Sequence, residues 1–271
     1  MANALIGSSG FVGSTLLRQT GFDALYRSTN IAEIDGRRFD TVVCAAAPAQ
    51  KWIANREPEA DRRNIDALTG HLDTLQCRRF VLVSTVDVFR EPEGVDEDSP
   101  ADDSALHAYG LHRRLLERFC QQRFEQCLVV RLPGLVGPGL RKNALFDLLN
   151  DNNLHAIDAR GVFQFYPMVN LWADLLRALE AGLPLVHLAG EPVSVAEVAR
   201  EAFGRAFDNQ LPNPPARYDL RSRHAGVFGG QGAYAYSRRE TLLAIRAYAQ
   251  SEPRSLPAVA PAPAAAEGTA R

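Results

Sequence analysis

Three glycines, each separated from the next by two residues, lie near the N-terminus in the segment ALIGSSGFVGSTLL, residues 4–17. They are Gly7, Gly10 and Gly13; an apolar, strand-like run precedes them and a helix-like run starts near Phe11. Glycine can turn the chain, let backbone approach a pyrophosphate without a colliding Cβ, and let a helix pack closely on a sheet. The free N–H groups at a helix N-terminus attract phosphate. The segment therefore predicts a dinucleotide-binding turn, and a plain glycine-rich turn is the alternative.

Strand-like and helix-like segments alternate through the first half of the chain. The strand-like segments are almost continuously apolar, which is typical of parallel strands buried on both faces, and the helix-like segments repeat apolar residues at helical spacing. The expected strands are residues 4–6, 24–27, 39–48 (running into a turn), 79–85 and 127–134, and the expected helices start near residue 11 and cover 58–75 and 105–123. This alternation predicts an α/β fold with a Rossmann-type, doubly wound parallel sheet.

The pattern loosens after about residue 134, which predicts a smaller C-terminal α/β part. Its expected elements are a short helix within 137–152, a strand within 161–168, helices over 170–182, 194–204 and 238–249, a strand over 183–190 and a loop over 205–236. We expect residues 1–133 to form a nucleotide-binding domain to which the strand near 184–190 returns, and residues 134–250 to be mainly substrate-binding. Residues 251–271 are rich in Ala and Pro and predict a disordered tail.

Composition sets the broad class of protein. The chain has 271 residues, of which 46% are hydrophobic and 23% charged, and its net charge of −2 gives no basic footprint for nucleic acid. No apolar stretch reaches the ~18 residues that span a bilayer, and the strand close to Met1 leaves no room for a signal peptide. The four cysteines contain no C-x-x-C pair, which favours a reducing cytoplasm. The six histidines lack metal-ligand spacing, so we expect no metal site.

Several motifs resemble the extended short-chain dehydrogenase/reductase family, which comprises sugar-nucleotide epimerases, dehydratases and reductases. Over about residues 3–200 they follow one another in the family's order: GSSGFVG, CAAAP, NIDALTGHLDTL, VSTVDVF, EDSPADDSALHAYGLHR, RLPGLVGPG and FQFYPMVNLWADLLRAL. The resemblance implies bound NAD or NADP. It also implies hydride transfer between the nicotinamide and a carbon of a nucleotide-linked sugar or a similar hydroxyl or keto substrate.

The resemblance also assigns catalytic positions. Tyr109 matches the family's catalytic tyrosine, a general acid or base, and Thr85 matches the hydroxyl residue that bonds the reacting oxygen. Ser84 is the alternative to Thr85, because one register step exchanges the two. Four residues after the tyrosine the family has a lysine that holds the nicotinamide ribose and supplies positive charge, and here the residue is Arg113. Either Arg113 does this work in a remodelled pocket, or the domain binds the cofactor without catalysis.

Further cofactor contacts are expected around the glycine turn and the ends of the next strands. The full set is Gly7, Ser9, Gly10, Phe11, Val12, Gly13, Arg27, Ser28, Ala45, Ala46, Ala47, Asn64, Tyr109, Arg113 and Pro133. In NAD-preferring enzymes an acidic residue at the end of the second strand binds both ribose hydroxyls. Here that strand ends at Arg27 and Ser28, which suit a 2′-phosphate, so NADP is favoured over NAD. The segment before residue 39 leaves little room for the usual intervening helix and strand.

Substrate contacts are expected from the C-terminal part. They are Lys142, Asn143, Gln164, Tyr166, Asn170, Arg221 and Arg223, and the arginines suit phosphate. Asp87 lies two residues after Thr85, whereas family dehydratases place Asp-Glu directly after the threonine. Reduction or epimerisation is therefore better supported than dehydration.

Two further expectations concern the whole protein and its alternatives. A non-catalytic NAD(P)-binding or redox-sensing protein is the competing interpretation, motivated by Arg113. The resemblance implies a homodimer built on the tyrosine helix, where the candidate contacts are Leu115, Leu116 and Phe119, although packing on the sheet explains them equally. We expect His112 and Arg114 on the surface of the same helix.

Overall fold

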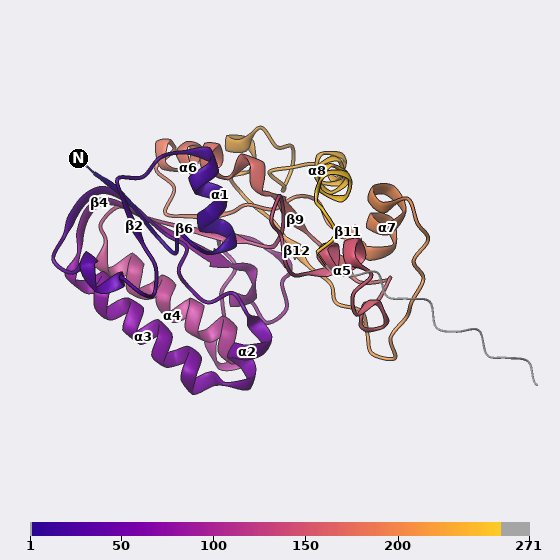
Figure 1. Cartoon of the computed structure of the whole chain (residues 1–271), viewed down its shortest axis with the longest axis horizontal. Helices are drawn as coiled ribbons and strands as arrows, with labels where there is room; N and C mark the ends of the chain where they lie inside the picture. The colour runs from indigo at the N-terminus through magenta and orange to yellow at the C-terminus, as the bar shows by residue number, and fades with distance from the viewer. Residues whose placement is uncertain (1, 256–271) are drawn as a thin grey trace, which may run out of the picture.

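A parallel six-stranded sheet lies at the centre of the computed structural model, which describes residues 2–255 (Figure 1). The strand order is β10-β6-β4-β3-β1-β2, and every neighbouring pair is parallel. The strands are β1 (Asn3–Ile6), β2 (Ala24–Tyr26), β3 (Arg38–Cys44), β4 (Gln76–Thr85), β6 (Cys127–Leu132) and β10 (Leu185–His187). The predicted α/β class with a parallel sheet is confirmed.

Helices cover both faces of this sheet, because its strands are apolar on both sides. Successive strand residues point to opposite faces. Ala4 and Ile6 of β1 accordingly share one buried cluster with α3 and α4, whereas Leu5 shares a second cluster with α1 and α6. Figure 1 shows the two helix pairs on opposite sides of the strands. The helices are α1 (Phe11–Gln19), α3 (Pro58–Thr74), α4 (Ala108–Arg123) and α6 (Leu171–Glu180).

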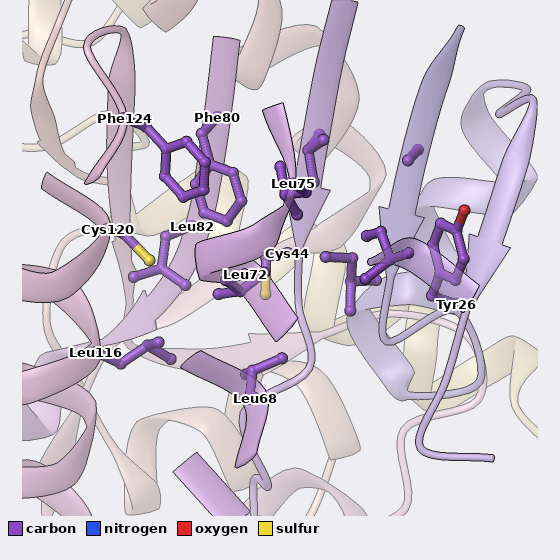
Figure 2. Close-up of a cluster of buried hydrophobic side chains, with 14 of the residues drawn as sticks. Tyr26, Cys44, Leu68, Leu72, Leu75, Phe80, Leu82, Leu116, Cys120 and Phe124 are labelled. Atoms are coloured by element: carbon purple, nitrogen blue, oxygen red, sulfur yellow. The ribbon is translucent and has the colours of Figure 1, made fainter. Parts of the chain in front are cut away.

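The cluster between the sheet and the α3–α4 pair is closely packed (Figure 2). Phe80 of β4 stacks on Phe124, which follows α4, with ring centroids 4.1 Å apart and an interplanar angle of 4°. Leu116 is 1% exposed within this cluster, and Phe119 packs against it. These two candidates for a dimer contact are therefore used to pack the helix on the sheet.

The link between β2 and β3 is short. It holds a single turn of 3-10 helix, η1 (Ile31–Ile34), and no further strand among the described residues. As a result β2 is the edge strand of the sheet. This agrees with the limited length of sequence available for an intervening helix and strand.

The C-terminal part combines short strands and helices around a third buried cluster, which contains side chains from α5, α7 and α8. Between α6 and α7 the chain returns to the central sheet, where β10 pairs with β6. The remaining pairs are β7 with β9, β8 with β11 and β5 with β12. The bounds are α2 (Lys51–Arg56), β5 (Glu93–Val95), β7 (Gly134–Val136), α5 (Ala144–Asn150), β8 (Val162–Phe163), β9 (Phe165–Pro167), β11 (Val193–Ser194), α7 (Val195–Phe203), β12 (Asp219–Leu220) and α8 (Arg238–Ser251). Further 3-10 turns are η2 (Val86–Val88), η3 (Asp103–Ala105), η4 (Leu154–Ala156), η5 (Met168–Asn170) and η6 (Ala225–Phe228).

Some elements differ from the sequence prediction. The helix expected over 105–123 begins at Ala108, since the His107 ring accepts a hydrogen bond from the Gly110 N–H at 3.1 Å and caps the helix. The sequence pattern missed α2, because six residues are too few to show helical periodicity. The loop expected over 205–236 contains β12 and η6.

The predicted tail, residues 251–271, lies only partly within the described residues. Arg254 pairs with Asp151 at 2.8 Å, and the Ser255 N–H donates to the side-chain oxygen of Asn150 at 2.8 Å. The prediction is therefore wrong for these first tail residues, which are bonded to the end of α5. The rest of the predicted tail, residues 256–271, lies outside the described residues.

The packing of α1 against the glycine turn requires glycine at position 13 and yields a stability prediction. A Cβ there would lie 2.1 Å from the Gly7 carbonyl oxygen, so Gly13→Ala is expected to destabilise the protein by about 1–3 kcal/mol. Urea unfolding followed by circular dichroism should show a lower midpoint.

Gly70→Ala is the matched control for Gly13→Ala. Position 70 lies on α3, and a Cβ there meets no described atom within 4 Å. Alanine favours an exposed helix by about 1 kcal/mol over glycine, so the urea midpoint should rise. A Gly13→Ala midpoint equal to that of wild type would contradict the close contact between position 13 and the Gly7 carbonyl oxygen.

Candidate active site

The glycine turn and the end of β3 meet at the carboxyl edge of the sheet. Because β1 lies between β2 and β3, this edge is a topological switch point, where parallel sheets bind ligands. Gly7 has a φ of +86°, and a Cβ there would lie 2.5 Å from the Ala45 carbonyl oxygen. A Cβ at Gly10, the N-cap of α1, would by contrast meet only the Gly7 oxygen, at 3.5 Å, among the described residues. The space in front of Gly10 is therefore open to a ligand.

The end of β2 lies beside the same turn. The Tyr26 carbonyl oxygen accepts hydrogen bonds from the N–H groups of Gly7 at 2.8 Å and Ser8 at 3.2 Å. Arg27 and Ser28 follow directly and are exposed, as is Ser9. The other predicted residues at this edge are half-buried: Phe11, Val12, Ala45, Ala46, Ala47 and Pro133.

The end of β4 separates the two candidate hydroxyl residues. Ser84 is buried and donates to Glu117 Oε1 at 2.6 Å. Thr85 points the other way, because successive strand residues alternate, and its hydroxyl is near enough to the Tyr109 phenol to lower the pKa of that phenol. Thr85 is thus the hydroxyl residue near Tyr109, whereas Ser84, the alternative, turns into the interior.

Tyr109 is positioned by a close approach of α4 to the turn after β4. A Cβ at Gly110 would lie 2.1 Å from the Asp87 carbonyl oxygen, so only glycine allows this contact. The Tyr109 N–H donates to Asn55 Oδ1 at 3.0 Å, which ties the first turn of α4 to α2. Gly110 and Asn55 were not singled out from the sequence, where a glycine inside a helix signals only a packing or functional reason.

Several groups act on the Tyr109 phenol, whose side chain is 9% exposed. Burial is the largest influence and raises its pKa, and the charge of Asp87 raises it further. Arg113, Lys51 and Thr85 oppose this, yet the pKa of Tyr109 remains above its usual value near 10. The phenol is therefore protonated at neutral pH.

Arg113 does not present its terminal nitrogens to a ligand. It is 2% exposed, and its two terminal nitrogens donate to both carboxylate oxygens of Asp61 and to the Pro48 and Tyr109 carbonyl oxygens. Its guanidinium carbon lies 4.0 Å from the centroid of the Tyr109 ring. Only Nε lacks a partner among the described residues. These bonds differ from the predicted arrangement, in which Arg113 holds the nicotinamide ribose.

Asp61 is a buried partner of Arg113 that the sequence analysis did not single out. Asn64, three residues later, is exposed on α3, and its cofactor contact stays a prediction. Asp61 is 5% exposed and bonds to Arg113 and to His112 Nδ1, the latter at 2.7 Å. The expectation that His112 lies at the surface is therefore wrong. Asp61 shares the buried face of α3 with Ile65, one turn later, and this spacing was the available signal.

A second ion pair also acts on the phenol. Lys51, at the start of α2, donates from Nζ to Asp87 Oδ1 at 2.7 Å. Tyr218, from the C-terminal part, is near enough to this pair to raise the pKa of Lys51. Burial lowers the pKa of Lys51, but Asp87 and Tyr218 outweigh it and leave that pKa raised. Lys51 is thus a protonated ammonium, and 40% of its side chain is exposed.

The prediction that Gln164 and Tyr166 line a substrate site is wrong. Gln164 is 1% exposed, and its amide bonds to the backbone of Gly190 and Leu220. Tyr166 is fully buried, and its hydroxyl donates to Asp174 at 2.7 Å. The polar groups of both side chains form their hydrogen bonds inside the core.

The other predicted substrate residues lie nearer the surface but differ in what they bond. Asn143 caps α5, because its side-chain oxygen accepts a hydrogen bond from the Leu145 N–H at 2.9 Å. This oxygen is therefore already bonded within the protein. Arg221 and Arg223 are ion-paired with Asp219 and Asp98, and Asn170 is half-buried at the end of η5. Lys142 donates to the Ala49 carbonyl oxygen, just before α2. Burial lowers the pKa of Lys142, and the nearby charge of Asp87 opposes this.

A buried polar network bonds to the end of β4 through Ser84. Glu117 is fully buried and accepts from Ser84 and from Arg131, at 2.7 Å from Nη2. Arg131 in turn contacts His187 Nε2 at 3.2 Å. Burial lowers the pKa of His187 to about 4, so this imidazole is neutral in the folded protein at neutral pH.

Two cavities, of about 430 and about 590 Å³, are lined mainly by α7 and α8 and share no lining residue with the Tyr109 cluster. Within residues 2–255 no three His, Cys, Asp or Glu side chains are grouped to hold a metal ion. In the same range no helix is long and apolar enough to cross a membrane.

Solved structures resemble this chain over almost its whole length. RMD from Pseudomonas aeruginosa complexed with NADPH is 17% identical, with a TM-score of 0.67 and coverage of 93% of this chain and 98% of that one. The dTDP-4-dehydrorhamnose reductase of Clostridium acetobutylicum is 16% identical, with a TM-score of 0.69 and coverage of 92% and 99%. The chain has the fold of these enzymes.

A third similar structure is that of an epimerase. A UDP-glucuronic acid 4-epimerase mutant from Bacillus cereus, in complex with a fluorinated UDP-sugar and NAD, is 15% identical, with a TM-score of 0.66 and coverage of 92% and 99%. No protein-family model and no curated protein matches the sequence. The motif resemblance is therefore confirmed at the level of the fold.

His187 makes the stability of the protein depend on pH. Its pKa is about 4 when folded and near 6.5 when unfolded, so between these values the unfolded state binds more protons. The free energy of unfolding should therefore fall as the pH drops from about 6.5 to about 4, with a His187 share approaching 1.4 kcal/mol per pH unit. Urea unfolding at stepped pH measures the slope.

The variant His187→Gln should flatten this slope, because it removes the titrating group. His155→Gln, at an exposed site on η4, is the matched control and should keep the wild-type slope. Equal slopes in wild type and His187→Gln would show that the buried imidazole is not the source.

Proposed function

We propose that the protein is an NAD(P)-dependent oxidoreductase that reduces or epimerises a nucleotide-linked sugar or a similar hydroxyl or keto substrate. The observation that carries this proposal is that Tyr109 lies near Thr85, at the same edge of the sheet as the glycine turn, where α4 approaches the turn after β4 closely. The similar structures hold NADPH, or NAD together with a nucleotide sugar, which supports the same classes of ligand here.

The residues at the glycine turn fit a dinucleotide. The open space at Gly10 and the N-terminus of α1 would take the diphosphate. The exposed Arg27 and Ser28, with no acidic residue at the end of β2, would take a 2′-phosphate, so we propose NADP in preference to NAD. When bound, the nicotinamide supplies or accepts the hydride.

Tyr109 would give its proton to a substrate carbonyl oxygen. Burial raises the pKa of its phenol and keeps it protonated. A protonated phenol can donate to the oxygen that gains negative charge while the neighbouring carbon takes up hydride. Thr85, near the phenol, would hold the same oxygen. This protonation state favours reduction over oxidation of a hydroxyl, which first needs a base.

A non-catalytic NAD(P)-binding protein is the second candidate. Arg113, at the position of the family's lysine, is bonded to Asp61 and stacked on Tyr109 instead of facing a ligand. One assay separates the candidates: purified protein is titrated with NADPH and then given dTDP- and UDP-linked keto sugars. Binding without loss of NADPH absorbance would favour the binding protein, and mass spectrometry of co-purified ligands would name the sugar.

The cytoplasmic location and the homodimer remain predictions. Since Leu116 and Phe119 pack into the core, Leu115, half-buried on α4, is the remaining candidate of the three. Analytical ultracentrifugation of wild type and Leu115→Glu would test the dimer contact.

Tyr109→Phe tests the proton donor. It should lower turnover by at least about 100-fold, because general acid catalysis contributes about 10²–10⁴-fold, and leave NADPH affinity, measured by nicotinamide fluorescence, almost unchanged. Tyr248→Phe is the matched control, since its buried hydroxyl has no hydrogen-bond partner among the described residues. Wild-type turnover in Tyr109→Phe would refute the assignment.

Arg27→Ala tests the choice of cofactor. Losing a charge-assisted contact to the 2′-phosphate should weaken NADPH binding by about tenfold and leave NADH binding unchanged. Arg62→Ala, exposed on α3, is the control. An equal change for NADPH and NADH would contradict a 2′-phosphate contact at Arg27.

A further inference from the structure

The proposed reaction removes the Tyr109 proton in each turnover, and the phenol is poorly placed to regain one from water directly. Its side chain is 9% exposed and lies under the Arg113 guanidinium. Arg113 cannot deliver a proton, because a guanidinium stays protonated in proteins, and its terminal nitrogens are bonded to Asp61 and to backbone oxygens. The proton therefore needs another route.

A chain of polar groups leads from the phenol toward the surface. The Thr85 hydroxyl donates to Asp87 Oδ2 at 3.4 Å, and it is near enough to the Tyr109 phenol to lower the pKa of that phenol. The other oxygen of Asp87 accepts from Lys51 Nζ at 2.7 Å. Exposure rises along this chain to 16% for the Asp87 side chain and 40% for that of Lys51. The outer end of the chain is thus in contact with solvent.

We propose that Lys51, Asp87 and Thr85 relay a proton from solvent to Tyr109. The proposal rests on the proposed function, since only an enzyme that turns over deprotonates the phenol. Lys51 suits the outer position because its ammonium can lose and regain a proton, which an arginine cannot. Lys51 thereby does the proton-supplying work for which the position of Arg113 is unsuited.

The steps balance without any added reagent. The Thr85 hydroxyl gives its proton to the phenolate, and Asp87, having taken a proton from the Lys51 ammonium, passes it to Thr85. The neutral Lys51 amine then takes a proton from water or buffer and becomes an ammonium again. The net change is one proton moved from solvent to Tyr109, with the Lys51–Asp87 ion pair restored.

Other groups set the position and charge of the relay. Tyr218 lies near Lys51 and Asp87 and raises the pKa of Lys51. Thr85 ends β4 beside the phenol. The titratable or charged groups around Tyr109 are Asp87 after β4, Lys51 on α2, Arg113 and His107 of the α4 segment, Asp61 on α3 bonded to Arg113, Tyr218, and Lys142 near Asp87 and Arg113. Among these, Lys51 and Asp87 are the ion pair linked to the phenol through Thr85.

The first experiment measures the coupling without substrate or cofactor. The protein has seven tyrosines, so ¹³Cζ-tyrosine NMR assigns Tyr109 by its loss in Tyr109→Phe and follows it through a pH titration. Lys51→Met removes a cation and should raise the pKa of Tyr109, whereas Asp87→Asn removes an anion and should lower it. Arg56→Met, exposed on the same helix as Lys51, should change nothing. An unmoved Tyr109 pKa in both Lys51→Met and Asp87→Asn overturns the relay.

The second experiment measures turnover with NADPH and the nucleotide sugar that wild type reduces. Lys51→Ala should lose at least about tenfold in turnover while keeping its NADPH affinity, and added ethylammonium should restore part of the rate in this variant but not in Tyr109→Phe. Wild-type turnover in Lys51→Ala, or a loss that no amine rescues, overturns the relay and leaves the proposed function standing. Wild type that fails to bind NADPH overturns the proposed function instead, and the NMR titration then decides whether Lys51 and Asp87 act on Tyr109.

Discussion

The close approach of α4 to the turn after β4 is the contact on which the candidate site depends. At Gly110 the helix backbone touches the Asp87 carbonyl oxygen, with no room for a Cβ. Tyr109 is the preceding residue, so this contact brings its phenol to the Thr85 hydroxyl at the end of the strand. The end of β4 is also fixed on its interior side, because Ser84 donates a hydrogen bond to the buried Glu117.

Two ion pairs act on the phenol and decide its protonation. Arg113 is neutralised by Asp61, and Lys51 by Asp87. Each cation therefore acts on the phenol together with its own anion, and burial becomes the largest influence on the Tyr109 pKa. The result is a neutral phenol, ready to donate a proton. The pairs differ in exposure to solvent, because Arg113 is 2% exposed whereas the Lys51 side chain is 40% exposed.

The sheet, its covering helices and the glycine turn could be predicted from the sequence because each follows from local patterns. Continuous apolar runs require two buried faces, and helical spacing identifies α3 and α4. The site was harder to predict. Asp61, which is buried on α3 and bonds to Arg113, was not singled out, and Gln164 and Tyr166 turn into the core. Such errors arise because a motif gives the position of a residue along an element, whereas packing decides which neighbour its side chain meets.

By itself the sequence determined the order of strands and helices and the turn at Gly7, Gly10 and Gly13. These depend on periodicity and on the backbone freedom of glycine, which are properties of neighbouring residues. Only the tertiary structure decided that Arg113 is committed to Asp61 and that Lys51 lies with Asp87 beside the phenol. The physical reason is that charges pair across space: Arg113 and Asp61 are 52 residues apart along the chain, and no local pattern encodes that distance.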